Sequence, residues 1–213
     1  MNRTQLINKL IESKGFKTYL EIGTENKRQN FDLINIESKE CVDINPNAEA
    51  TYTMSSDEFF ETIPADKKYD IIFIDAMHVE EYVDKDLTNS LKHLNSGGII
   101  CLHDVIPMSK SCAQKKEKYE NVGVWNGDVY RTITKLHNTS LNYVTVFNHD
   151  HGLCVLFDND NTQIDITKLE CEYTYEDLYD DSGQDINHIT KLGKELLRLI
   201  TVEEFIKKFS KSE

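Results

Sequence analysis

Two apolar segments in the middle of the chain each end in an acid and a histidine. The first is followed by Asp75 and His78, and the second by His103 and Asp104. An imidazole titrates close to neutral pH and can serve as a general base. Carboxylates together with imidazoles also form mixed oxygen and nitrogen sites for divalent cations. These four residues are therefore candidates for acid–base or metal chemistry, provided that the fold brings them together.

The strands and the helix around these four residues predict that the fold brings them together. Residues 69–74 and 99–102 are nearly continuous apolar runs, which are typical of strands covered on both faces of a parallel sheet. Between them, residues 82–94 carry apolar side chains at helical spacing, and Gly97 and Gly98 are expected to end that helix. Strand, helix and strand form a right-handed βαβ unit whose ligands bind at the carboxyl ends of the strands. Both polar clusters should thus lie at one edge of the sheet.

A second group of candidates follows the earlier strands. Residues 19–23 and 40–44 read as strands, and Asp43 lies 20 residues after Gly23. A glycine lets the backbone approach a nucleotide, and an acid at the end of the next strand can accept hydrogen bonds from ribose hydroxyls. The alternative for Asp43 is a turn residue or a helix cap.

Residues 51–54 predict a short third strand, and a helix follows with a capping box made by Ser55 and Glu58. Ser56 and Asp57 either cap this helix or contact a nucleotide. Strands and helices that alternate in this way predict an α/β protein with a doubly wound parallel sheet.

Composition narrows the class of partner. The chain has 213 residues and a net charge of −13, which argues against a nucleic acid or an anionic membrane as the main partner. No apolar run approaches the length of a membrane span, and the first 15 residues lack the apolar segment of a signal peptide, so a cytoplasmic location is the default expectation. The five cysteines show no CxxC spacing, and neither disulfides nor a zinc site is expected.

Taken together, these motifs resemble class I S-adenosylmethionine-dependent methyltransferases, and most closely the small O-methyltransferase-like proteins linked to glycan or secondary-metabolite biosynthesis. The resemblance covers roughly residues 15 to 155. It rests on residues 19–23, 42–43, 54–60, 73–78 and 94–104.

This family resemblance implies a Rossmann-like, mostly parallel seven-stranded sheet with an antiparallel last strand. Residues 1–160 would form the cofactor-binding domain, and residues 161–213 an acidic loop and helices packed on the same domain. The apolar faces of the C-terminal helices must be buried either on that domain or across a homodimer interface.

The resemblance also implies roles for the residues near the first two strands. Glu21 and Gly23 would line the methionine end of S-adenosylmethionine, and Asp43 would hold the ribose. The family's first turn usually reads Glu-x-Gly-x-x-x-Gly, and here Lys27 stands in place of the last glycine. Ser56 and Asp57 would border the adenine.

At the reacting centre, Asp75 would face the methyl group and His78 would act as the general base, since an alcohol acceptor needs help to lose its proton. A second hypothesis is a Mg2+ or Mn2+ ion on Asp75 and Asp104, joined by His78 or His103. The remaining alternative for His103 and Asp104 is a strand end that satisfies loop backbone.

Three functions follow from these observations. The first is an O-methyltransferase for a small hydroxylated acceptor such as a sugar or sugar conjugate. The second is a binding or regulatory protein that keeps the fold without catalysis. The third, an NAD-dependent oxidoreductase, is less favoured because the chain lacks the three glycines that surround a pyrophosphate.

Overall fold

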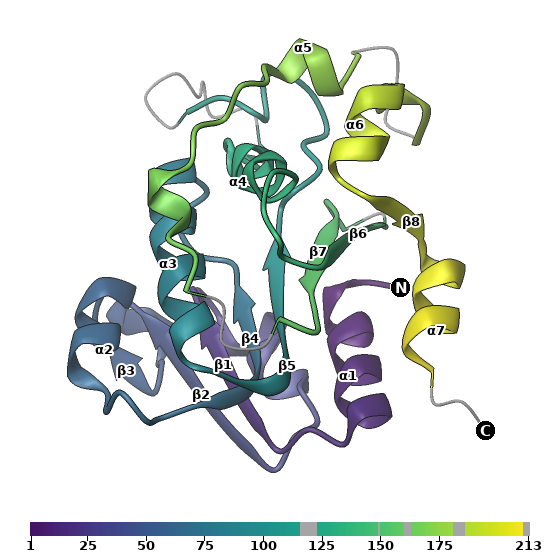
Figure 1. Cartoon of the computed structure of the whole chain (residues 1–213). Coiled ribbons are helices and arrows are strands. Elements are labelled where there is room, and N and C mark those ends of the chain that lie inside the picture. Colours follow the sequence, from purple (N-terminus) through teal and green to yellow (C-terminus); the bar gives the residue numbers. More distant parts are fainter. Residues whose placement is uncertain (116–122, 149, 160–162, 181–185, 211–213) are drawn as a thin grey trace.

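The computed structural model describes residues 1–115, 123–148, 150–159, 163–180 and 186–210. Within them one mixed sheet contains eight strands: β1 (Thr18–Ile22), β2 (Ser38–Asp43), β3 (Tyr52–Thr53), β4 (Tyr69–Ile74), β5 (Leu94–His103), β6 (Tyr143–Phe147), β7 (Leu153–Leu156) and β8 (Leu199–Thr201). Their order across the sheet is β3-β2-β1-β4-β5-β7-β6-β8 (Figure 1).

All neighbouring strands are parallel except where β7 pairs with β5 and β6. The predicted fold class, with its parallel strands and antiparallel late strand, is confirmed. The sheet has one strand more than the seven expected. An acidic loop and helices were expected over residues 161–213, but Leu199–Thr201 forms β8, which satisfies the backbone hydrogen-bonding groups of the β6 edge.

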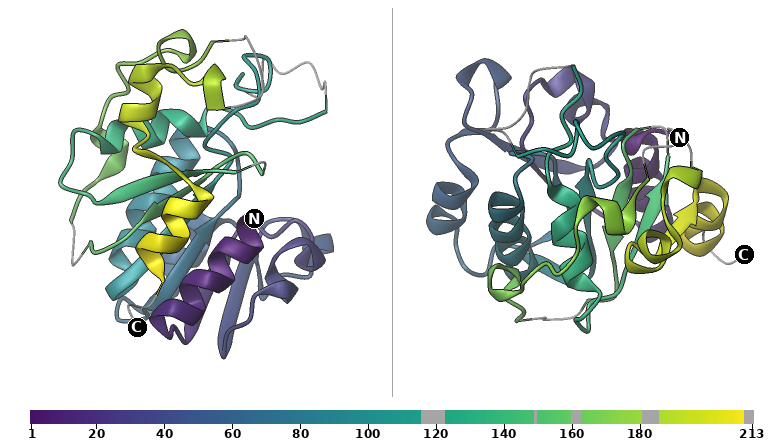
Figure 2. Two further views of the ribbon diagram at one scale, coloured as in Figure 1. Left: turned by 90° about the vertical axis from the view of Figure 1, so that its right-hand side faces the viewer. Right: turned by 90° about the horizontal axis from the view of Figure 1, so that it is seen from above.

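Helices cover both faces of the sheet (Figures 1 and 2). They are α1 (Arg3–Lys14), α2 (Ser56–Thr62), α3 (Glu80–Lys92), α4 (Val129–Leu136), α5 (Tyr175–Leu178), α6 (Lys191–Leu196) and α7 (Val202–Phe209). Alternate side chains of β4 enter different cores: Ile71 and Phe73 pack on the side of α1 and α7, whereas Ile72 and Ile74 pack on the side of α2, α3 and α4. This alternation is the period of two expected of a strand buried on both faces.

The C-terminal helices bury several of their apolar residues within the chain, whereas Leu192 of α6 is 40% exposed. Leu196 at the end of α6 lies in the core beneath α3 and α4, and Phe205 and Phe209 of α7 pack with α1. A homodimer through these helices stays a prediction. Among the described residues, none of the helices is long and apolar enough to cross a membrane.

The glycines predicted to end α3 lie elsewhere. The helix ends at Lys92, and Gly97 and Gly98 fall inside β5, where the pairing with β4 changes register after Tyr69. Gly97 has φ +71, and a Cβ at Gly98 would come within 2.9 Å of the Asp70 carbonyl. The glycines are therefore needed for an irregular strand start and close backbone packing.

Candidate active site

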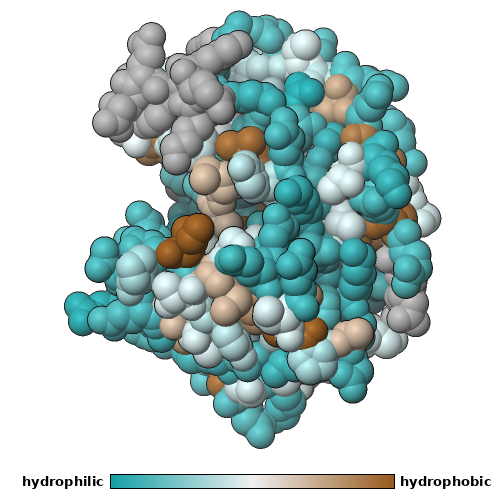
Figure 3. All heavy atoms as spheres, turned by 90° about the vertical axis from the view of Figure 1, so that its left-hand side faces the viewer, coloured by the Kyte–Doolittle hydropathy of each residue, from teal (hydrophilic) through white to brown (hydrophobic). Residues whose placement is uncertain are grey.

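A cavity of about 660 Å³ opens along the carboxyl ends of five neighbouring strands. It is lined successively by Ser56 after β3, Asp43 of β2, Gly23 after β1, Asp75 after β4 and Asp104 after β5. The surface on this side of the molecule is hollowed, with hydrophobic atoms on the rim of the recess (Figure 3). The strand order therefore brings together polar groups from well-separated parts of the sequence.

The first turn of the cavity depends on one glycine and one acid. Gly23 has φ +82, and a Cβ there would overlap the backbone of Asp75 and Ala76. The Asp43 carboxylate accepts hydrogen bonds from the backbone N–H groups of Thr24 at 2.8 Å and Glu25 at 2.7 Å. Its other oxygen, Oδ1, accepts from the backbone N–H of Asn45 at 2.7 Å. Asp43 thus fixes a turn that lacks the second glycine, and the remaining lone pair on Oδ1 can accept a hydrogen bond from a ligand.

Glu21 lies in the floor of the cavity and is only 1% exposed. Its carboxyl group accepts hydrogen bonds from the Tyr19 hydroxyl at 2.6 Å and the Asn30 amide at 2.7 Å. Burial raises the pKa of Glu21 to about 7. Asn30 could not be recognised from sequence patterns, since its neighbours form only the short turns η1 (Lys27–Gln29) and η2 (Phe31–Leu33).

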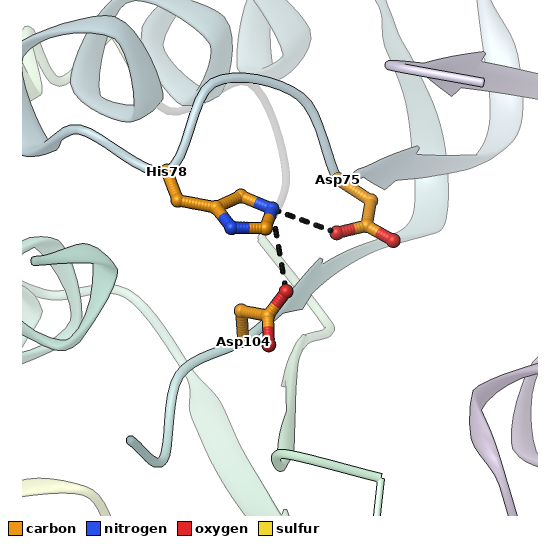
Figure 4. Close-up of side chains that lie close together, drawn as sticks. All are labelled: Asp75, His78 and Asp104. Atoms are coloured by element: carbon orange, nitrogen blue, oxygen red, sulfur yellow. Dashed lines mark hydrogen bonds and ion pairs between the residues drawn. The ribbon is translucent and has the colours of Figure 1, made fainter. Parts of the chain in front are cut away.

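Asp75, His78 and Asp104 meet at the other end of the cavity (Figure 4). His78 Nε2 lies 3.3 Å from Asp75 Oδ1 and 3.2 Å from Asp104 Oδ2. Burial lowers the pKa of His78, but the hydrogen bond with Asp75 and the charges of Asp104 and Asp75 outweigh it and raise the pKa to about 9. The two strand ends predicted to share one edge of the sheet are indeed adjacent.

His103 lies beneath this group and is almost completely buried. Its Nδ1 is 3.3 Å from both Asp75 Oδ1 and Asp104 Oδ2, and its Nε2 is 2.8 Å from the Asp150 carbonyl oxygen. Burial works to raise the pKa of Asp75, but the charge of and hydrogen bond with His103 hold it well below its usual range. His103 is placed to orient the two carboxylates.

The orientation of His78 is set by the loop before α4. His78 Nδ1 lies 2.8 Å from the Trp125 carbonyl oxygen, and the backbone N–H of Asp128 donates to the His78 carbonyl at 3.2 Å. Gly127 has φ +63, and a Cβ there would overlap the His78 carbonyl. Because a carbonyl only accepts, Nδ1 carries a proton in both states of the ring, and below its pKa of about 9 the ring is also protonated at Nε2, which lies against the two carboxylates.

Two further contacts complete the cluster. The buried Asn126 amide donates to Asp104 Oδ1, and Asp104 itself has φ +57. Arg3 of α1 reaches across the cavity, with Nη1 3.1 Å from Asp150 Oδ1 and Nε 3.7 Å from Asp75 Oδ2. The pairing of Arg3 with Asp150 had no signal in the sequence.

Of the predicted cofactor residues, Asp57 does not line the cavity. Its carboxylate lies 3.2 Å from Lys85 Nζ on the outer surface, because Asp57 is the second residue of α2 and points towards α3. Ser56 does line the cavity, and beside it stands Asp86 of α3, which was not predicted. Asp86 lies on the buried side of an amphipathic helix, where sequence patterns lead one to expect apolar residues.

Comparison with known proteins supports the same fold. Residues 10–105 match the sequence model of a methyltransferase domain. None of the curated protein sequences compared with the chain matches it.

Several solved structures share the arrangement of strands and helices. A cofactor-bound protein from MTB is 14% identical and has a TM-score of 0.55, over 76% of this chain and 82% of that one. An O-methyltransferase from Streptomyces achromogenes involved in tomaymycin synthesis, in complex with SAM, is 13% identical, with a TM-score of 0.52 over 73% of this chain and 78% of its own. An O-methyltransferase from Bacillus cereus in complex with SAH is 14% identical, with a TM-score of 0.50 over 74% and 82%. The chain therefore has the fold of these methyltransferases.

Proposed function

We propose that this protein is an S-adenosylmethionine-dependent O-methyltransferase in which His78 is the general base. The observation that carries the proposal is the hydrogen bond between His78 Nδ1 and the Trp125 carbonyl, because it makes Nε2 the nitrogen that exchanges a proton. Since the pKa of His78 is raised to about 9, Nε2 becomes a free base as the pH rises towards that value. The match of residues 10–105 to a methyltransferase domain supports the same reaction class.

The cavity suits the proposed cofactor. Gly23 allows close approach of a ligand to the first turn, and Asp43 retains a lone pair on Oδ1 for a ribose hydroxyl. The carboxyl group of Glu21 lines the cavity and would balance the charge of the ammonium group in the methionine portion. S-adenosylmethionine, when bound, supplies a methyl group on a positively charged sulfur. Since it has no pyrophosphate, a single glycine in the first turn is sufficient for it.

The protein's own contribution is to position the acceptor and to take its proton. A hydroxyl group near Nε2 of the neutral His78 ring would donate to that nitrogen, and its proton would move there as the oxygen takes the methyl group. Asp75 and Asp104 flank this nitrogen at 3.3 and 3.2 Å, so they stabilise the imidazolium that forms. His103 and Asn126 hold the two carboxylates in place.

A divalent cation is a second arrangement that the same cluster supports. One ligand atom each from Asp75, His78 and Asp104 lie within 4.8 Å of one another. Asp75 and Asp104 would hold Mg2+ or Mn2+, which would lower the pKa of the acceptor hydroxyl. In that case His78 would be a ligand or a neighbouring base, and activity would depend on the added ion.

The acceptor is proposed to be a small hydroxylated molecule, such as a sugar or sugar conjugate. A second cavity of about 420 Å³ adjoins the first through Val124 and His151, and Ile106, Pro107 and Phe147 give it apolar walls. A conjugate with an apolar portion beside the reacting hydroxyl would use both cavities.

The first test is calorimetric titration with S-adenosylhomocysteine beside NAD, each with and without Mg2+. Micromolar binding of S-adenosylhomocysteine that weakens in Asp43→Ala is the expected result. Binding of NAD alone would favour an oxidoreductase, and binding of neither ligand would refute the proposed cofactor. In an acceptor screen, His78→Ala should lose turnover and keep its affinity for S-adenosylhomocysteine; turnover at the wild-type rate would exclude His78 as the base.

A further inference from the structure

A buried carboxyl group lies beside Ser56, on the side of the cavity next to the edge strand β3. Asp86 of α3 is 2% exposed, lines the cavity and has the Ser56 hydroxyl as its hydrogen-bonding neighbour. The acids and histidines that take part in the proposed reaction follow β4 and β5, whereas Ser56 follows β3 at the edge of the sheet.

The carboxyl group of Asp86 lacks the compensation that other buried acids of α3 receive. Asp84, two residues earlier, accepts hydrogen bonds from Lys135 at 2.5 Å and Thr132 at 2.8 Å. No ion pair is found for Asp86 among the described residues, and burial raises its pKa to about 7. A buried carboxylate is costly unless donors satisfy it, so this end of the cavity favours a ligand that brings a hydrogen-bond donor.

The apolar surroundings fit a flat ring. Tyr82 lies one helical turn before Asp86 on α3, and Ile44 directly follows the proposed ribose ligand Asp43. Both line the cavity, and they are 50% and 74% exposed. Large apolar side chains left exposed in a cavity are surfaces that a ligand can cover.

We propose that Asp86 recognises the 6-amino group of the cofactor's adenine, with Ser56 beside it and Tyr82 and Ile44 against the ring. This inference rests on the proposed function, since the transferred methyl group must lie near His78 and the adenine at the opposite end. Asp86 takes the role that the sequence resemblance gave to Asp57. An amino group donates to a carboxylate, whereas the carbonyl oxygen of hypoxanthine at the same position only accepts and is repelled.

The test compares S-adenosylhomocysteine with S-inosylhomocysteine, which has hypoxanthine in place of adenine, by calorimetry at pH 8.5. Wild type should prefer the adenine ligand by more than about tenfold, the effect typical of a hydrogen bond to a charged group. Asp86→Asn should reduce this preference at least about tenfold, because an amide can donate to the hypoxanthine oxygen. Asp57→Asn is the matched control, since that acid lies outside the cavity, and it should keep the wild-type preference.

The outcomes separate the two proposals. If wild type binds neither nucleoside ligand, the cofactor assignment fails and the role of Asp86 falls with it. If wild type binds both ligands equally, the role of Asp86 is refuted while the cofactor stands, and this result needs no variant to fold. A preference that Asp86→Asn leaves unchanged also refutes it.

Discussion

Asp86→Asn should stabilise the ligand-free protein, and increasingly so as the pH rises. In the folded protein, burial raises the pKa of Asp86 from 3.8 to about 7. Between these values the unfolded chain has lost the proton and the folded protein retains it. The free energy of unfolding therefore has its full contribution from this group below pH 4, and loses it as the pH rises through 7.

The size of the effect follows from the two pKa values. One pKa unit is worth about 1.36 kcal/mol, so the rise from 3.8 to about 7 amounts to roughly 4 kcal/mol above pH 7. Part of this loss, about 1 kcal/mol, is already present at pH 4.5. Asparagine does not ionise, and its advantage over aspartate should grow by roughly 3 kcal/mol between pH 4.5 and 8.5.

Urea unfolding at a series of pH values measures this difference, with circular dichroism and the fluorescence of Trp125, the only tryptophan, as probes. For a denaturant slope of about 2 kcal/mol/M, the midpoint of Asp86→Asn should gain about 1 M or more over wild type across this pH range. Glu21 also has a raised pKa, but it is present in both proteins and cancels. Asp57→Asn should show a much smaller pH-dependent gain, because the charge of Asp57 raises the pKa of Asp86 less than burial does. Parallel midpoint curves for wild type and Asp86→Asn would refute the reasoning.

Three other substitutions test the packing around the cavity. Gly127→Ala should lower turnover at least about tenfold with a smaller effect on S-adenosylhomocysteine affinity, because the added Cβ overlaps the His78 carbonyl. Gly15 has φ +71 and a Cβ there would meet no atom within 4 Å, so Gly15→Ala measures the effect of backbone strain alone in a thermal melt. Gly23→Ala should weaken S-adenosylhomocysteine binding in calorimetry and destabilise the fold by more than the roughly 1–3 kcal/mol of strain alone, and an unchanged affinity would contradict the close approach. Lys135→Met should cost about 3–5 kcal/mol in urea unfolding, because it leaves the carboxylate of Asp84, 2.5 Å from Lys135 Nζ, buried without its cation, whereas Glu80 keeps its ion pair with Arg131; a loss below about 1 kcal/mol would show that water replaces the lysine.

The sequence predicted those parts of the fold that depend on local patterns. The strand at 69–74 is apolar on both faces because cores lie on both sides of it, and the capping box of Ser55 and Glu58 is present at the start of α2. The strand at 199–201 escaped prediction because its pairing with β6 lies more than 50 residues away, and its apolar residues also fit a helix.

The site was predictable where its residues end strands and not where they come from elsewhere. Asp75, His78, His103 and Asp104 could be expected to meet because adjacent parallel strands end at one edge. The position of Asp86 depends on how α3 packs over the cavity.

The contact between Arg3 and Asp150 joins residues 147 positions apart in the sequence. Three carboxylates, those of Asp75, Asp104 and Asp150, come together around His103, and Arg3 contacts two of them. During synthesis, Asp75 and Asp104 leave the ribosome well before the segment that carries Asp150. The carboxylates around His103 can therefore all be in place only after β7 has paired with β5. We expect the part of the cavity around Asp75 and Asp104 to become ordered late in folding.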